Sequence, residues 1–147
     1  MAKPRNSETA PLVNPLEAHL GYQLRRASVF AMTDLGTRLT PTGLRPSEVA
    51  VLMVIRANSG CQQGAIGELL GIKSANMVPL VARLVKQGLV NRARADGRSH
   101  ALSLTPAGRT RVATVNQLLE RHESAIQSRL DEQSLSRLFA CLATLRN

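Results

Sequence analysis

The chain has 147 residues, a length that fits one domain, or one domain with extensions that dimerise. Only 2% of the residues are aromatic, so an aliphatic core made by packed helices is favoured over aromatic-rich strands. The formal net charge of +9 favours a polyanionic partner, nucleic acid first and an anionic membrane second, although a protein without such a partner can also be basic. The excess is concentrated in one segment, since residues 73–111 hold eight basic side chains and one acidic one.

Several functional classes lack their usual sequence signals. No run of about eighteen apolar residues occurs, and Lys3 and Arg5 precede no apolar stretch, so we expect a cytoplasmic protein without a membrane span or secretory signal. Cys61 and Cys141 lie outside any zinc pattern, and a structural disulfide between them is not expected. The dispersed histidines, His122 among them, are assigned solvated or capping roles, and no metal or cofactor is expected. Without a G-x-S-x-G, H-E-x-x-H, P-loop or dinucleotide motif, an enzyme is not expected.

The first third of the chain predicts an arm and two helices. Residues 1–14 contain prolines and polar residues without periodicity and are predicted to form a mobile N-terminal arm. Apolar residues at three- or four-residue steps then predict a long amphipathic helix over roughly 15–38, which Thr40–Gly43 ends. Pro46 suits the first turn of a second helix, apolar on most sides and therefore buried, that stops at Asn58–Gly60.

The middle of the chain predicts a helix-turn-helix. A short helix over 63–70, a tight turn at Gly71 and a helix over 74–87 follow one another, and Gly88 is the expected C-terminal stop. Gly71 permits the left-handed backbone that such a turn often needs. The small core beneath these helices is expected to contain Ile66, Leu69, Leu70, Val81, Leu84, Val85 and Leu89.

The next segments change to a strand-like pattern. Residues 89–94 and 99–104 are predicted strands, and the Asp-Gly pair between them is a strong hairpin signal. Thr105 is expected to cap a helix that begins at Pro106 and runs to about 129. A last helix starts within 131–133. Its apolar face is formed by Leu135, Leu138, Phe139, Leu142 and Leu145.

The exposed side of the 74–87 helix is expected to face DNA. Lys73 and Ser74 are placed to hold phosphate near the helix N-terminus. Asn76 can bond adenine, and Met77 can pack on a thymine methyl group. Arg83 is either a further DNA contact or an ordinary surface arginine.

The hairpin is interpreted as a wing. Arg98 at its tip suits a narrow minor groove, with a solvated turn residue as the alternative. Asp96 is better placed to orient an arginine than to approach phosphate itself. Arg92 and Arg94 on the strand are expected to reach flanking phosphates.

Two further assignments concern regulation. Tyr22 and Phe30 on the first helix favour a core role over a ligand pocket. If they line a pocket, Arg25 or Arg26 can meet the carboxylate of an acidic ligand. Cys61 is an alternative sensor, since an exposed thiol of low pKa reacts with peroxide.

Four runs of sequence together resemble the MarR family of winged helix-turn-helix transcriptional regulators. The runs are Gly67–Ile72, Leu80–Arg92, Asp96–Arg98 and Leu102–Gly108. The third is the Asp-x-Arg motif of the family's wing, and the fourth is its Leu-x-Leu-Thr-x-x-Gly exit into the next helix. The resemblance spans about 16–145. Pro79, inside the recognition helix, departs from the common pattern and puts the assignments of Asn76 and Met77 in question.

The resemblance implies a mainly α fold with a small β-hairpin wing, forming one domain over 15–147. Helices over 15–39 and 106–147 would form a homodimer, and 45–105 the DNA-binding lobe. The implied function is a sequence-specific regulator, a repressor of a pseudo-palindromic operator in double-stranded DNA, released by a small aromatic or phenolic acid. The alternatives are a non-specific architectural DNA-binding protein and a thiol-based redox regulator that uses Cys61.

Overall fold

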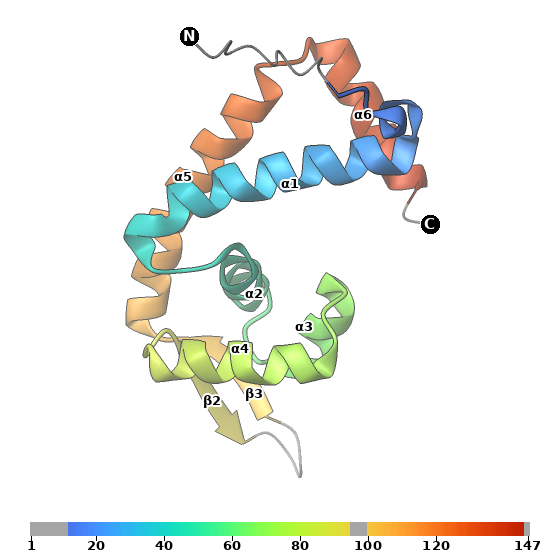
Figure 1. The fold of residues 1–147 in the computed structure, drawn as a ribbon. Coiled ribbons are helices and arrows are strands. Elements are labelled where there is room, and N and C mark those ends of the chain that lie inside the picture. Colours follow the sequence, from blue (N-terminus) through green and yellow to red (C-terminus); the bar gives the residue numbers. More distant parts are fainter. Residues whose placement is uncertain (1–11, 95–99, 146–147) are drawn as a thin grey trace, which may run out of the picture.

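The structure is a computed structural model that describes residues 12–94 and 100–145 (Figure 1). Its elements in chain order are η1 (Pro15–Ala18), α1 (Leu20–Leu39), η2 (Thr40–Thr42), α2 (Pro46–Ala57), β1 (Cys61–Gln62), α3 (Gln63–Leu70), α4 (Ser74–Lys86), β2 (Val90–Arg94), β3 (His100–Leu104), α5 (Pro106–Gln127) and α6 (Glu132–Thr144). The predicted fold class, mainly α with a winged helix-turn-helix, is confirmed. Residues 1–11 of the predicted N-terminal arm lie outside the described residues.

The molecule has two parts joined by long helices. A lobe formed by α2, α3, α4 and the strands lies at one end, and α6 lies at the other end (Figure 1). Helices α1 and α5 connect them and contact one another along the way. The sheet is antiparallel in the order β1-β3-β2, with Cys61 opposite Leu102 and Val90 opposite Leu104. The wing is therefore fixed to the lobe through β3.

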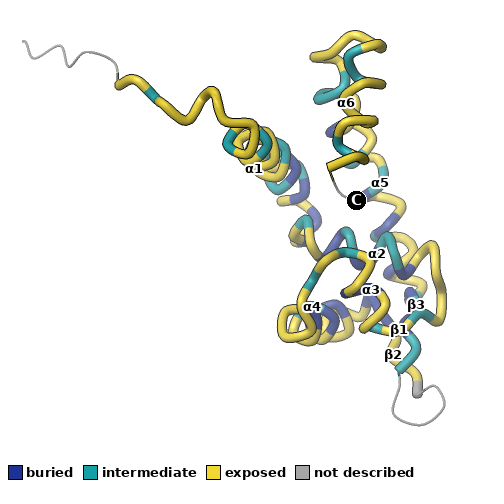
Figure 2. The backbone as a smooth tube through the Cα atoms, turned by 90° about the vertical axis from the view of Figure 1, so that its right-hand side faces the viewer, coloured by how far each residue is buried: buried dark blue, intermediate teal, exposed yellow. Residues whose placement is uncertain are grey.

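The core is aliphatic and lies almost entirely in the lobe. Among its fully buried side chains are Leu52 and Ile55 of α2, Ile66 of α3, Leu84 of α4 and Leu102 of β3. Figure 2 shows that buried residues gather in this lobe and in the adjoining parts of α1 and α5, whereas α6 and the first half of α1 are mostly exposed. The lobe thus folds around its own core, and the long helices extend from it.

Three sequence expectations need correction. The predicted first helix is broken, because Asn14 caps a separate turn, η1, and His19 is extended before α1 begins at Leu20. Leu69 and Val85, expected in the core, are 68% and 37% exposed. The strand β1 was not expected, since two residues are too few for periodicity to reveal and their pairing partner lies forty residues away.

Within the described ranges, no single helix is long and apolar enough to cross a bilayer. The pair α3 and α4 reaches the combined length and composition, but it is bent by 119° at the turn between the helices.

Candidate nucleic-acid interface

The turn between α3 and α4 is built by two glycines. Gly71 ends α3 with a left-handed backbone, φ 65° and ψ 27°, and its N–H donates to the Glu68 carbonyl at 3.2 Å. The Ile72 N–H donates to the Gly67 carbonyl at 2.8 Å, which closes the turn. A Cβ on Gly67 would lie 2.9 Å from the Ile72 carbonyl oxygen, so only glycine allows this close approach. The turn fixes the angle between the two helices.

The expectation that Met77 stands on the exposed face of α4 is wrong. Its side chain is 1% exposed and belongs to the core. The reason is helical spacing, because Met77, Val81 and Leu84 lie three or four residues apart and form the buried face of α4. The sequence already contains this spacing, which is typical of a buried helix face. A buried methionine has no access to a base.

The outward face of α4 carries polar residues near its N-terminus. Lys73 precedes the helix without making a side-chain cap, and Ser74 and Asn76 are exposed. The helix continues through Pro79 to Lys86 without a break. Pro79 lacks an N–H and so removes only one hydrogen bond of the helix. The exposed polar residues of α4 therefore stay on one continuous face.

Arg83 is held by a partner on another helix. Its Nε lies 2.8 Å from Oε1 of Glu48 on α2, and the Glu48 side chain is only 3% exposed. The other carboxylate oxygen, Oε2, accepts the Arg45 backbone N–H at 2.8 Å. Sequence reasoning missed Glu48. Its place in the sequence could have revealed it. Glu48 is three residues after Arg45, the residue before α2, and a glutamate at this position often completes a capping box.

The described part of the wing presents one of the predicted arginines. Arg92 on β2 is exposed, and its Nη2 lies 3.4 Å from His100 Nδ1 on β3. Asp96, Arg98 and the side chain of Arg94 lie outside the described residues. The structure therefore brings one predicted wing residue onto the same lobe as α4 and leaves the other three as predictions.

Thr105 fixes the base of the wing. Its Oγ1 accepts the Gly108 N–H at 2.9 Å and donates to the Gly88 carbonyl at 2.6 Å, so one hydroxyl joins the end of α4 to the start of α5. The predicted helix cap at Thr105 is confirmed. Further along α5, the Arg111 guanidinium donates to the Thr42 carbonyl. Part of the predicted basic cluster thus also has structural partners.

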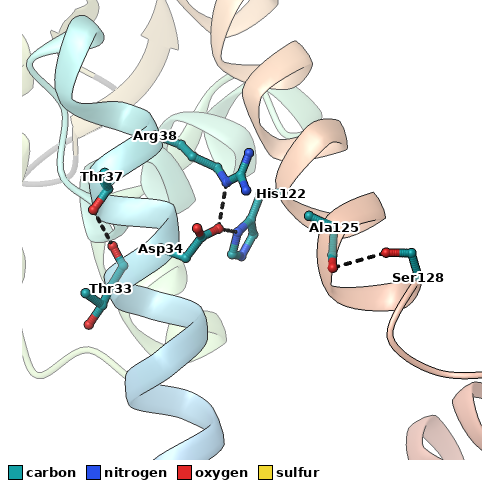
Figure 3. A network of polar contacts seen from close by, with 7 residues as sticks. All are labelled: Thr33, Asp34, Thr37, Arg38, His122, Ala125 and Ser128. Carbon is teal, nitrogen blue, oxygen red and sulfur yellow. Dashed lines mark hydrogen bonds and ion pairs between the residues drawn. The ribbon is translucent and has the colours of Figure 1, made fainter.

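A polar cluster joins the two long helices (Figure 3). The Nδ1 of His122 on α5 and the Nε of Arg38 lie 2.8 Å and 2.6 Å from the same oxygen, Oδ2 of Asp34 on α1. Arg38 first and His122 second hold the pKa of the Asp34 carboxyl below its ordinary value. The expectation that His122 has a solvated or capping role is wrong, because it is 2% exposed. Across the described residues, no group of three or more metal-ligating side chains gathers.

The candidate ligand residues lie on the exposed part of α1. Phe30 is 47% exposed, and the guanidinium of Arg129, in the turn after α5, lies 4.6 Å from the centre of its ring. The Arg26 guanidinium lies 5.9 Å from the Tyr22 ring centre. Arg25 is exposed on the same helix. The expectation that the rings belong to the core is not met for Phe30. One arginine–ring pair lies within α1, and the other joins α1 to the turn after α5.

Comparison with known proteins decides the family. The MarR family sequence pattern matches residues 42–99, from η2 through α4 into the wing. The chain is also 30% identical, over 97% of its length and 89% of the relative, to a "putative transcriptional regulatory protein for hcr operon" of Thauera aromatica. The chain belongs to the MarR family. The relative is a transcriptional regulator by its description, as are the solved structures below, and none is described as an enzyme.

Two solved structures of a transcriptional repressor match almost the whole chain. The transcriptional repressor CouR bound to a 23-mer DNA duplex is 34% identical, covers 94% of this chain and 100% of its own, and has a TM-score of 0.89. CouR bound to p-coumaroyl-CoA is 33% identical, covers 90% and 94%, and has a TM-score of 0.84. The likeness therefore extends beyond the winged lobe to the long helices.

Proposed function

We propose that this MarR-family regulator is a homodimeric repressor that binds a pseudo-palindromic operator and is released by the coenzyme A thioester of an aromatic acid. The observation that carries the proposal is the likeness to CouR, which extends over the lobe and the long helices and includes one DNA-bound and one p-coumaroyl-CoA-bound structure. The site of action is the chromosome in the cytoplasm.

DNA binding uses the exposed start of α4 and the wing. Lys73 and Ser74 hold backbone phosphate, and Asn76 reads a base edge in the major groove. Arg92 and Arg94 of β2 hold flanking phosphates. At the hairpin tip, Arg98 enters the minor groove and Asp96 orients an arginine.

The homodimer forms through the long helices. Leu20 and Val29 of α1 are 64% and 57% exposed. Phe139 of α6 and Leu145, which follows that helix, are 58% and 57% exposed. Apolar side chains gathered in this way mark a protein–protein interface, and a second copy supplies the same apolar chemistry. A two-fold dimer places two winged lobes on two half-sites about one helical turn apart.

The effector is a thioester of coenzyme A. The arginines and aromatic rings of α1 suit such a ligand, since guanidinium groups bind phosphates and aromatic rings stack on the acyl group. Tyr22, Arg25, Arg26 and Phe30 are the proposed contacts. The ligand releases DNA by stabilising a lobe spacing that does not match the operator. A full reversal from bound to free requires about 5.5 kcal/mol of differential affinity.

Selection from genomic DNA fragments tests the DNA-binding part. We expect an inverted repeat bound on the order of a thousandfold more tightly than random DNA near physiological salt. Recovery of no motif, with affinity set only by salt and length, would leave a non-specific architectural protein. Analytical ultracentrifugation of the same protein is expected to give a dimer.

Titration of the operator complex with p-coumaroyl-CoA, free p-coumarate and free coenzyme A tests the effector part. We expect only the thioester to release DNA. Arg25→Gln and Arg26→Gln are expected to raise the concentration of p-coumaroyl-CoA that is needed to release DNA. Without the thioester, both variants should bind DNA as tightly as the wild type. Release of DNA by p-coumarate alone would show that the effector is a free aromatic acid and not its coenzyme A thioester.

A further inference from the structure

A groove lined by both polar and apolar side chains separates the start of α2 from the outward face of α4. It has a volume of about 440 Å³. Arg45 and Ser47 from the start of α2 line one side, and Asn76 and Arg83 of α4 line the other. Because Asn76 lies on the exposed face of α4, the groove opens beside the surface proposed to meet DNA.

The charges in the groove are arranged by one buried carboxylate. Both oxygens of Glu48 are occupied, Oε1 by the Arg83 Nε and Oε2 by the Arg45 backbone N–H, each at 2.8 Å. The Glu48 side chain lines the groove but is only 3% exposed, so its negative charge is compensated by these two donors inside the protein. The positive side chains remain accessible, since Arg45 is exposed and the Arg83 side chain is 41% exposed.

The ion pair holds Arg83 in one orientation. A guanidinium bound through Nε can still donate through its two Nη groups, which is the geometry that recognises phosphate oxygens. A serine hydroxyl such as that of Ser47 and a second guanidinium from Arg45 complete a set of donors. The groove therefore offers donors and positive charge next to a side chain placed to read a base.

We propose that this groove binds a backbone phosphate of the DNA, with Arg45, Ser47 and Arg83 as donors and Glu48 as the residue that positions Arg83. The proposal rests on the proposed DNA-binding function and extends the interface from α4 and the wing to α2. A phosphate held here fixes the register of α4 in the major groove, because phosphate contacts orient a protein on the duplex without reading sequence.

Salt dependence of DNA affinity tests the donors. Arg45→Gln and Arg83→Gln are each expected to weaken binding to operator and to random DNA by the same factor, about tenfold. Each is also expected to make the slope of log affinity against log salt shallower by about 0.9, the value for one phosphate contact. Arg121→Gln, on the half of α5 remote from the lobe, removes the same charge and should leave the slope unchanged. Slopes of both groove variants equal to that of the wild type would overturn the proposal.

A double-mutant cycle tests the positioning role of Glu48. Glu48→Gln is expected to weaken DNA binding as Arg83→Gln does, and the double variant should be no weaker than Arg83→Gln alone. Equal effects of Glu48→Gln in both backgrounds would show that it acts on folding and not through Arg83. If Glu48→Gln does not fold, Arg83→Lys provides a second test, because lysine keeps the positive charge but lacks the guanidinium group that Glu48 holds. Full DNA affinity of Arg83→Lys would contradict the positioning role of Glu48.

The experiments distinguish a failure of the proposed repressor function from a failure of the proposed phosphate groove. If the wild type shows no preference for any operator, the proposed repressor function is wrong. The comparison of salt slopes on random duplex DNA still decides whether the groove binds phosphate.

Discussion

His122 on α5 and Asp34 on α1 form a polar contact of 2.8 Å between residues that are 88 positions apart in the sequence. Because an ionised carboxylate only accepts hydrogen bonds, the proton of this contact is on Nδ1 of His122. Arg38, one turn after Asp34, donates to the same carboxylate oxygen. The contact joins the two long helices, so it helps to set the position of the lobe relative to the helices that are proposed to dimerise.

Asp34 is expected to make stability dependent on acid pH. Its pKa is lowered in the folded state by Arg38 and His122, so its contribution is full above the unfolded value of about 3.9 and is lost as pH falls through the lower folded value. Asp34→Asn should therefore lower the melting temperature at neutral pH, and the difference from the wild type should shrink below about pH 4.

Arg38→Gln provides the control for this effect. Because Arg38 is the largest cause of the lowered pKa, NMR titration of the Asp34 carboxyl in this variant should give a value closer to the ordinary one. A melting-temperature difference between wild type and Asp34→Asn that stays constant down to pH 2 would show that the cluster contributes no charge-dependent stability.

Most of the fold followed from the sequence because its boundaries are local. Pro46 and Pro106 stand in the first turns of α2 and α5, and Gly71 and Gly88 have positive φ at the turns that they were expected to form. Each of these residues restricts or frees its own backbone, so one position suffices to locate a boundary. The predicted helices over 63–70 and 74–87 match α3 and α4 to within one residue.

The parts that were missed depend on distant partners. The buried state of His122 requires Asp34 from another helix, and the orientation of Arg83 requires Glu48. No spacing within one helix reveals such a pair. Met77 is a different case, since its helical spacing with Val81 within one helix is enough to indicate the core face.

The hydroxyl of Thr105 is expected to stabilise the junction of the wing with α5. Thr105→Ala removes both the cap on Gly108 and the bond to Gly88, and should lower the free energy of unfolding by about 1 to 2 kcal/mol. Denaturant unfolding measures this loss. The control is Thr114→Ala, an exposed mid-helix position on α5, where the change should stay within about 0.5 kcal/mol. Equal losses of unfolding free energy in the two variants would contradict a specific role of Thr105 at the junction.

Gly67 is expected to tolerate no side chain. In Gly67→Ala the new Cβ would meet the Ile72 carbonyl oxygen at 2.9 Å and the Met77 Cγ at 3.2 Å, so α3 and α4 must separate. We expect a loss of about 1 to 3 kcal/mol in the free energy of unfolding and weaker operator binding, because the recognition helix shifts. The matched control on α3 is Gly64→Ala, where nothing lies within 4 Å. Unfolding and operator titrations in which both variants behave alike would contradict the close-approach argument.

Cys61 is expected to be a poor redox sensor. It is half-buried on β1, and burial raises the pKa of its thiol, so little thiolate is present at neutral pH to attack peroxide. We expect peroxide treatment to leave operator affinity unchanged. In alkylation followed by mass spectrometry, the exposed Cys141 should react before Cys61, with Cys141→Ser losing the fast phase and Cys61→Ser the slow one. Release of DNA by peroxide in the wild type but not in Cys61→Ser would instead support thiol-based regulation.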